Sequence, residues 1–354
     1  MDPALLAAPA AAVAGLGGAH AVWRRAFGRP PAGLPAVLAY HKVGTAELGG
    51  TWCTRRQFAA HLDALHDGGY TVVDLAAFQD RLDLLCAGGG GAVPALVVSS
   101  GAGAASRARS EYMDVRAARV PSAAEARMAG AERPPQRPKT PPAREVLITF
   151  DDAWASFAAH AFPELVKRGF PASLFVVVDY VGQRAGWDLA LPGRRALHLD
   201  WAALRALVAA GVEIGSHTAT HRDLRRLTPA QLEGELAGSR RQLEDALGVR
   251  VRAVSYPFGR CDARVVDAAA AAGYRLGFAM CPPGPNARVG RFALRRWGVY
   301  VTDTPHAVLD KVDPARRGFW FQDLFTRGVH AVAALSARGT RDAPHRAGDD
   351  QSAG

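Results

Sequence analysis

Two short stretches decide the fold: VLITFDD at residues 146–152 and VEIGSHTATH at residues 212–221. In each, a short run typical of a buried strand leads directly into carboxylate or imidazole side chains. Functional groups gather where the strands of a parallel sheet end. We therefore expect both stretches to place their polar residues on one rim of the same sheet.

Strand and helix patterns alternate on both sides of these stretches. Upstream, residues 36–40 (AVLAY) predict a strand, residues 54–68 a helix with Thr54 as its N-cap, and residues 70–73 a second strand. Downstream, the expected helices cover 157–168, 200–210, 229–247 and 263–272, and the expected strands cover 172–178, 212–215, 254–256 and 276–279. Repeated βα units of this kind favour an α/β fold with a parallel barrel.

The pattern is interrupted once. Residues 87–144 contain a GGGG run, scattered Arg and PPQRPKTPP, a composition that predicts a disordered insertion into a single domain. The expected organisation is an Ala-rich segment at 1–33, the first part of the barrel at 34–86, the insertion at 87–144, the main part at 145–305, and a C-terminal helix with a disordered tail at 306–354.

Two apolar segments bear on membranes. Residues 4–23 carry no charge and precede Arg24 and Arg25. Their length suits a membrane span, but Ala and Gly contribute little to insertion. A weak anchor, an unusual export signal and an Ala-rich helix on the domain all stay open, and so does the compartment. Residues 320–335 are expected to pack on the barrel, with membrane contact as the alternative.

Composition narrows the classes of function. The 354 residues carry a net charge of +10, and the four cysteines lie far apart. The basic residues are scattered and form no nucleic-acid motif, so a solvated surface is favoured over nucleic-acid binding. The cysteine spacing argues against a zinc ribbon or a disulfide scaffold. Nothing in the sequence indicates the oligomeric state.

Asp151, Asp152, His217 and His221 are the chemically suggestive residues. Neighbouring residues leave a strand in opposite directions, so one Asp can bind a cation while the other moves protons. Alone, the Asp pair is better explained as a turn in which Asp152 caps the next helix. Two His four residues apart can bind one metal, although that spacing alone is equally consistent with chance.

The combination favours a catalytic metal site. Asp152, His217 and His221 would supply three ligands and leave positions open for water and substrate. This donor set suits Zn²⁺ best, with Ni²⁺ or Co²⁺ as alternatives. A bound divalent ion acidifies water and polarises a carbonyl, and Asp151 can take the proton as the water attacks. YPFG at 256–259 follows another predicted strand, but alone it is best explained as a plain turn.

These motifs resemble those of the polysaccharide deacetylase (NodB-homology) family, carbohydrate esterase family 4. TFDDAW at 149–154 is similar to its first motif, which usually has Gly in place of Ala153, and SHTATH matches its second. YPFG resembles its third motif, with Tyr256 where many members have Arg. The resemblance implies a distorted (β/α) barrel of about seven strands. It also implies Asp151 as base, Asp152, His217 and His221 as metal ligands, and Tyr256 as the donor of an oxyanion N–H.

The upstream part extends the resemblance. LAYHKV at 38–43 and QFAAHLDALHDGGYTVVDL at 57–75 are similar to the branch that deacetylates poly-N-acetylglucosamine, in which the strand with the general-acid His opens the domain. His41 matches that position, and residues 294–300 (LRRWGVY) end without the Leu-His of the common arrangement. A buried structural role at a strand end is the alternative for His41. The missing Arg at position 256 implies that Asp151 lacks its orienting partner.

The resemblance implies a metal-dependent hydrolase that removes N-acetyl groups from the amino sugars of a polysaccharide or glycoconjugate. An O-acetyl glycan esterase is an alternative, because the same site serves an ester and an amide. A deacetylase-like fold retained as an inactive glycan-binding module is disfavoured, because the base and all three ligands are present. The expected partner is an acetylated glycan.

Overall fold

The computed structural model describes residues 33–44, 50–88, 144–184, 196–280 and 290–336. All of them belong to one compact unit. The predictions for the Ala-rich segment, for nearly all of the insertion at 87–144 and for the C-terminal tail fall on residues outside these ranges and stay predictions. Within the described ranges, no helix is both long and apolar enough to cross a membrane.

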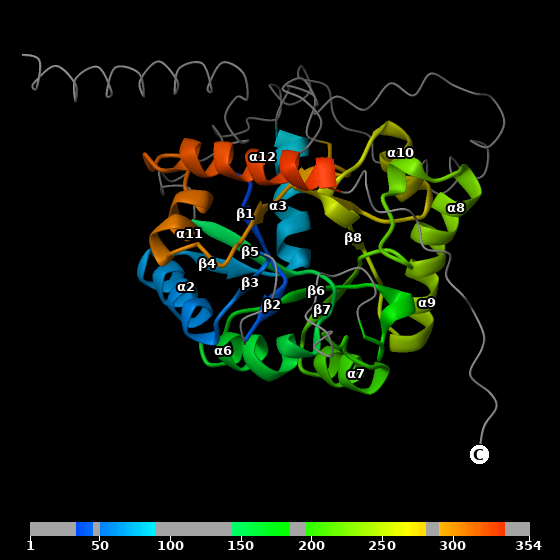
Figure 1. Ribbon diagram of the computed structural model, residues 1–354, viewed down its shortest axis with the longest axis horizontal. Helices are drawn as coiled ribbons and strands as arrows, with labels where there is room; N and C mark the ends of the chain where they lie inside the picture. The colour runs from blue at the N-terminus through cyan, green and yellow to red at the C-terminus, as the bar shows by residue number, and fades with distance from the viewer. Residues whose placement is uncertain (1–32, 45–49, 89–143, 185–195, 281–289, 337–354) are drawn as a thin grey trace, which may run out of the picture. The chain divides into compact units, whose positions relative to one another are not determined.

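A parallel sheet of nine strands forms the centre of the described unit (Figure 1). Its order is β10-β9-β8-β7-β6-β5-β1-β11, and β4 also pairs with β5. The strands are β1 (Ala36–Tyr40), β4 (Thr71–Val73), β5 (Glu145–Phe150), β6 (Ser173–Val176), β7 (Glu213–Ser216), β8 (Ala253–Ser255), β9 (Leu276–Ala279), β10 (Leu294–Arg295) and β11 (Trp297–Gly298). Because all pairs are parallel, the strands end on a common rim, as the sequence predicts.

One segment, residues 294–298, draws the two edges of the sheet together. β10 pairs with β9, and β11 pairs with β1, with Leu38 opposite Trp297. Arg296 lies between the two pairings, and its N–H donates to Ala279 O at 2.8 Å. The sheet is thereby nearly closed, which confirms the predicted α/β barrel. The sequence pattern did not reveal this closing segment.

Helices lie around the sheet (Figure 1). They are α2 (Arg55–Asp67), α3 (Leu75–Gly88), α6 (Phe162–Val166), α7 (Trp201–Ala209), α8 (Pro229–Glu233), α9 (Ser239–Leu247), α10 (Ala263–Ala271), α11 (Pro305–Val312) and α12 (Phe319–Ser336). Thr54 and Asp200 cap α2 and α7, as predicted. The single helix expected at 229–247 contains a π-helical turn, η4 (Gly234–Gly238), between α8 and α9.

α12 packs one face on the barrel. Phe319 is buried with its ring 4.9 Å from that of Trp297, and buried Asp323 pairs with Arg295. This confirms the predicted packing for that face. Phe321 and Leu324 are exposed.

Apolar side chains fill the interior of the barrel beneath the rim at which the strands end. The rings of Phe175 on β6 and Phe278 on β9 lie 5.7 Å apart, and Phe78 of α3 packs against Phe278. A side chain at position 215 would not fit, because a Cβ built on Gly215 lies 2.3 Å from the Phe175 ring. Leu147 on β5, Ala253 on β8 and Leu294 of the closing segment belong to the same apolar cluster. Strand side chains alternate in direction, so the residues two positions further along also point inward: Thr149, Ser255 and Arg296. Those residues are polar, and they begin the site.

Candidate active site

Asp152, His217 and His221 converge at the rim of the barrel. Asp152 Oδ1 lies 3.5 Å from His217 Nε2 and 3.6 Å from His221 Nε2. One potential ligand atom from each residue lies within 4.8 Å of the others. One carboxylate and two imidazoles, held together with little exposure, are a donor set that fits Zn²⁺ or a neighbouring first-row divalent ion.

The two loops that carry Asp152 and the His pair depart from regular backbone conformation. Asp152 and Ala153 have φ angles of 70° and 52°, and Thr218 and His221 have φ angles of 70° and 60°. Residues other than Gly avoid this left-handed region, so the surrounding structure must hold them there. The left-handed Ala153 also explains why Gly is the usual residue at this point of the motif.

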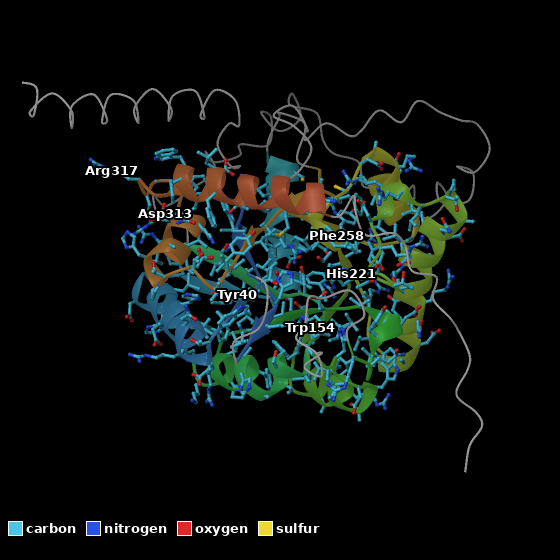
Figure 2. All side chains as sticks on the ribbon, in the orientation of Figure 1. Tyr40, Trp154, His221, Phe258, Asp313 and Arg317 are labelled. Carbon is cyan, nitrogen blue, oxygen red and sulfur yellow. The ribbon has the colours of Figure 1, made fainter. Side chains whose placement is uncertain are left out.

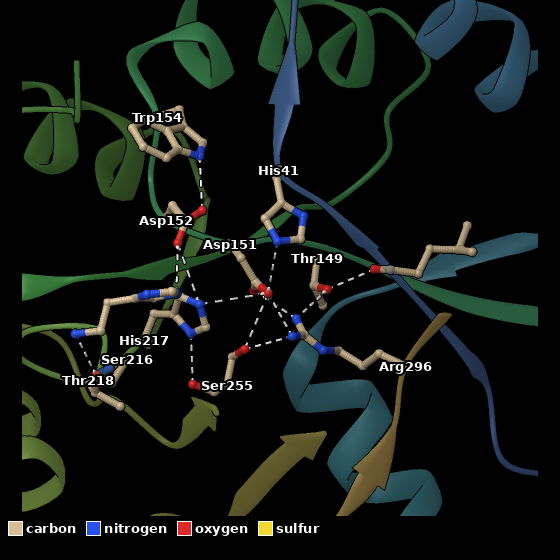
Figure 3. A network of polar contacts seen from close by, with 12 residues as sticks. His41, Thr149, Asp151, Asp152, Trp154, Ser216, His217, Thr218, Ser255 and Arg296 are labelled. Carbon is tan, nitrogen blue, oxygen red and sulfur yellow. Dashed lines mark hydrogen bonds and ion pairs between the residues drawn. The ribbon is translucent and has the colours of Figure 1, made fainter. Parts of the chain in front are cut away.

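Trp154 and His198 hold Asp152 through hydrogen bonds to atoms other than Oδ1. Trp154 Nε1 donates to Asp152 Oδ2 at 3.0 Å, and His198 Nδ1 donates to the Asp152 carbonyl oxygen at 2.6 Å. The two rings stack with centroids 4.1 Å apart. With Oδ2 bonded to Trp154, Oδ1 is the oxygen that faces His217 (Figure 3) and also His221.

The imidazoles are held in the form that binds metal. His217 Nδ1 donates to Ser255 O at 2.8 Å, which leaves Nε2 as the acceptor facing Asp152. Burial lowers the pKa of His217, although nearby Asp151 raises it in part. Burial, followed by the neighbouring His217, lowers the pKa of His221 well below its ordinary value of 6.5. Neutral imidazole is the ligand form of histidine.

Asp151 has a strong partner that the sequence did not predict. Arg296 Nη1 donates to Asp151 Oδ1 at 2.8 Å, and Nη2 donates to Oδ2 at 2.7 Å (Figure 3). The guanidinium also donates to Ser255 Oγ at 2.7 Å and to Thr149 Oγ1 at 3.2 Å. Arg296 is 0% exposed. The expectation that Asp151 lacks an orienting partner is therefore wrong, because the Arg comes from the closing segment.

The pair fixes the charge of Asp151. Burial alone would raise the pKa of this carboxyl group, but Arg296, with smaller contributions from His217 and His41, holds the pKa well below its ordinary value of 3.8. In this bidentate geometry, Asp151 Oδ2 also lies 4.0 Å from the Nε2 atoms of His41 and His217. Asp151 is thus a fixed carboxylate at neutral pH.

His41 faces the same carboxylate from β1. Its Nε2 lies 4.0 Å from Asp151 Oδ2, the same distance as that of His217 Nε2 (Figure 3). Its side chain is 22% exposed, in contrast to the closed surroundings of His217. The structure thus brings His41 to the site, more than a hundred residues from Asp151 in the chain, and leaves it accessible to a substrate.

Tyr256 does not occupy the position expected of it. Its N–H donates to Phe278 O at 3.0 Å within the sheet, and its buried hydroxyl donates to Phe292 O at 2.8 Å. The prediction that this N–H points at substrate is therefore wrong. The turn after it does reach the site: Phe258 is 40% exposed, and its ring lies 4.9 Å from that of His221 (Figure 2).

Sequence patterns missed Arg296, Trp154 and His198. One signal for Arg296 was present: it stands in a short apolar stretch, and strand alternation places one residue of the Arg-Arg pair inward. Trp154 follows the Asp pair closely and could have been weighed as its partner. His198 lies 46 residues from Asp152, without a motif that connects them.

Residues 138–277 match the family model described as polysaccharide deacetylase. This part of the chain is thus similar to a polysaccharide deacetylase domain. YxkH of Bacillus subtilis (strain 168), provisionally named a polysaccharide deacetylase, is 30% identical over 158 residues, which are 45% of this chain and 52% of YxkH. A chitooligosaccharide deacetylase of Bradyrhizobium sp. (strain ANU 289) is 30% identical over 132 residues, 37% of this chain and 53% of that protein. The chain thus spans about half the length of these relatives.

Solved structures share the fold of this chain. The deacetylase PplD of Streptococcus pyogenes, in complex with acetate, aligns with a TM-score of 0.54 over 79% of this chain and 98% of that chain, at 19% identity. IcaB of Ammonifex degensii aligns with a TM-score of 0.51 over 77% of this chain and 93% of that chain, at 21% identity. Such identities show the barrel fold alone.

Proposed function

We propose that this protein is a divalent-metal-dependent hydrolase that removes N-acetyl groups from the amino sugars of a glycan. The observation that carries the proposal is the position of Asp151. Its Oδ2 lies 4.0 Å from an imidazole of the metal side and 4.0 Å from the accessible imidazole of His41. A base, a metal-binding set and a candidate acid thus surround one small volume, as amide hydrolysis requires.

Asp152, His217 and His221 would hold the cation, which we propose is Zn²⁺. When bound, it would polarise the acetyl carbonyl and make a water more acidic. Asp151 then takes the proton of the attacking water. Because Arg296 keeps the pKa of Asp151 low, this carboxylate is deprotonated whenever substrate arrives. His41 gives a proton to the leaving amine from the more open side of the site.

The oxyanion donor is the Phe258 N–H in this proposal, in place of Tyr256. Pro257 has no N–H, and the chain turns at Phe258 through a left-handed conformation with φ 58°. The Phe258 ring packs against that of His221, so this backbone is next to the cation ligands. A backbone N–H aimed at the developing negative charge is a common source of transition-state stabilisation.

Acetate release measures the activity. We expect release from N-acetylglucosamine oligomers that stops after chelator treatment and returns with added Zn²⁺. Asp151→Asn should abolish release, and Tyr256→Phe should keep it, since the Tyr256 hydroxyl donates to Phe292 O and not to a residue of the site. Release from acetylated xylan but not from the amino-sugar oligomers would support an O-acetyl esterase instead. Full release in the presence of chelator would overturn the metal assignment.

A further inference from the structure

The loop that carries both imidazoles is bound to a buried carboxylate from a helical segment further along the chain. The N–H groups of Ala219 and Thr220, which lie between His217 and His221, both donate to Glu235 Oε2 at 2.9 Å. The Thr220 hydroxyl donates to Glu235 Oε1. Glu235 is only 6% exposed. A single side chain therefore accepts three hydrogen bonds from two of the three residues between His217 and His221.

The π-helical turn η4 places this carboxylate. Glu235 lies in η4, where the wider turn interrupts the helix between α8 and α9. π-helical turns inside α-helices are frequent at functional sites. Ser239, four residues further on, lies within 2.9 Å of Ser216 Oγ, which in turn accepts the Thr218 N–H at 3.1 Å. The same helical segment thus contacts both the start and the middle of the loop.

The opposite edge of the loop is also held. The carbonyl oxygens of Thr218 and Ala219 accept from the N–H groups of Val178 and Asp179, at 3.2 and 3.0 Å. Thr218 and His221 are left-handed, and this conformation is unfavourable for both residue types. Bonds on both edges therefore keep the loop in a conformation that its own residues do not favour. Glu235 contributes the charged bonds, which are stronger than neutral ones.

We propose that Glu235 is a positioning residue of the metal site. Its carboxylate holds the Ala219–Thr220 arc, so that His217 Nε2 and His221 Nε2 both face Asp152 Oδ1 at 3.5 and 3.6 Å. Without it, the loop relaxes and the two imidazoles no longer converge. This inference rests on the proposed metal-dependent function and adds a residue that touches neither cation nor substrate.

The test is Zn²⁺ affinity, measured by calorimetric titration of chelator-treated protein. Glu235→Ala should weaken Zn²⁺ binding by about 10- to 100-fold, the usual effect of removing a group that orients metal ligands. Its circular dichroism spectrum should match that of the wild type. Glu244→Ala is the matched control, since Glu244 accepts the Val251 N–H at 2.9 Å from the same helical segment, at a point away from the loop. It should leave Zn²⁺ affinity unchanged.

Two milder variants keep the test decisive if Glu235→Ala does not fold. Thr220→Val removes one of the three bonds, and Glu235→Gln removes the charge, so both should weaken Zn²⁺ binding in a folded protein. Wild-type Zn²⁺ affinity in the folded variants would overturn the inference. A wild-type protein that binds Zn²⁺ but releases no acetate would overturn the proposed function alone, and the affinities would still decide the role of Glu235.

Discussion

The metal side and the base side of the site are built in different ways. Asp152 and His221 lie on loops with left-handed backbone, and side-chain bonds from His198 and Glu235, outside the loops, hold them in place. Asp151 and Arg296 instead project from regular strand ends into the barrel, where the guanidinium lies 5.5 Å from the Phe175 ring. The metal side is thus a strained loop structure, and the base side is a continuation of the core.

This difference separates function from stability. Removing a metal ligand should abolish chemistry while the barrel persists, because the barrel does not depend on the loops for its packing. Removing one partner of a buried ion pair leaves the other charge without compensation in the interior, which costs about 3–5 kcal/mol. The base side should therefore lose fold and activity together. The same substitution should therefore have different consequences at the adjacent residues Asp151 and Asp152.

The largest expected effect comes from Asp152→Asn. This variant keeps the size of the side chain but removes the charged ligand, so acetate release should fall by about 10³-fold or more, since several kcal/mol of transition-state stabilisation depend on the cation. Zn²⁺ content should fall with it, while the free energy of unfolding without metal changes by less than about 1 kcal/mol. His66→Ala, at an exposed site on α2, is the control. Retained Zn²⁺ and activity would contradict the assignment.

Arg296→Met should give the next largest effect, and it should change both the stability of the fold and the activity. The free energy of unfolding should fall by about 3–5 kcal/mol, because Asp151 remains buried without its partner. Asp151→Leu/Arg296→Met should recover most of that stability and no activity, since paired apolar replacements avoid the buried charge. Urea unfolding of the wild type, Asp151→Leu, Arg296→Met and the double variant measures the coupling. Equal stability of wild type and Arg296→Met would show that the pair does not support the barrel.

The same variant should also respond differently to pH. In the wild type the pKa of Asp151 lies below its ordinary value of 3.8, so the ion pair stabilises the fold above about pH 4 and that contribution is lost as the pH falls below it. Without Arg296, burial raises the pKa of Asp151. The acidic limb of the activity profile should therefore move to higher pH in Arg296→Met.

The two sides also differ in how well the sequence predicted them. The proposed metal ligands lie in short motifs directly after apolar strands, and strand ends of a parallel sheet meet at one rim, so local patterns were enough to predict that Asp152, His217 and His221 come together. Arg296 could not be paired with Asp151 in this way, because the pairing depends on how residues 294–298 close the barrel. Closure is a property of the complete sheet. Tyr256 was misjudged for a related reason, since its N–H is used by the neighbouring strand β9.

The smallest expected effect tests the strain on the metal side. Ala153 and Ala39 are both buried, but Ala153 has a φ of 52°, whereas Ala39 lies in β1 on the base side. Replacing either by Gly removes the same buried methyl group and adds the same freedom to the unfolded chain. Only Ala153→Gly also relieves a left-handed conformation, which costs about 1–2 kcal/mol for residues with a Cβ. The free energy of unfolding should therefore be about 1–2 kcal/mol higher for Ala153→Gly than for Ala39→Gly. Equal losses in the two variants would mean that the loop after β5 carries no strain, and that the contrast between the two sides does not extend to the backbone.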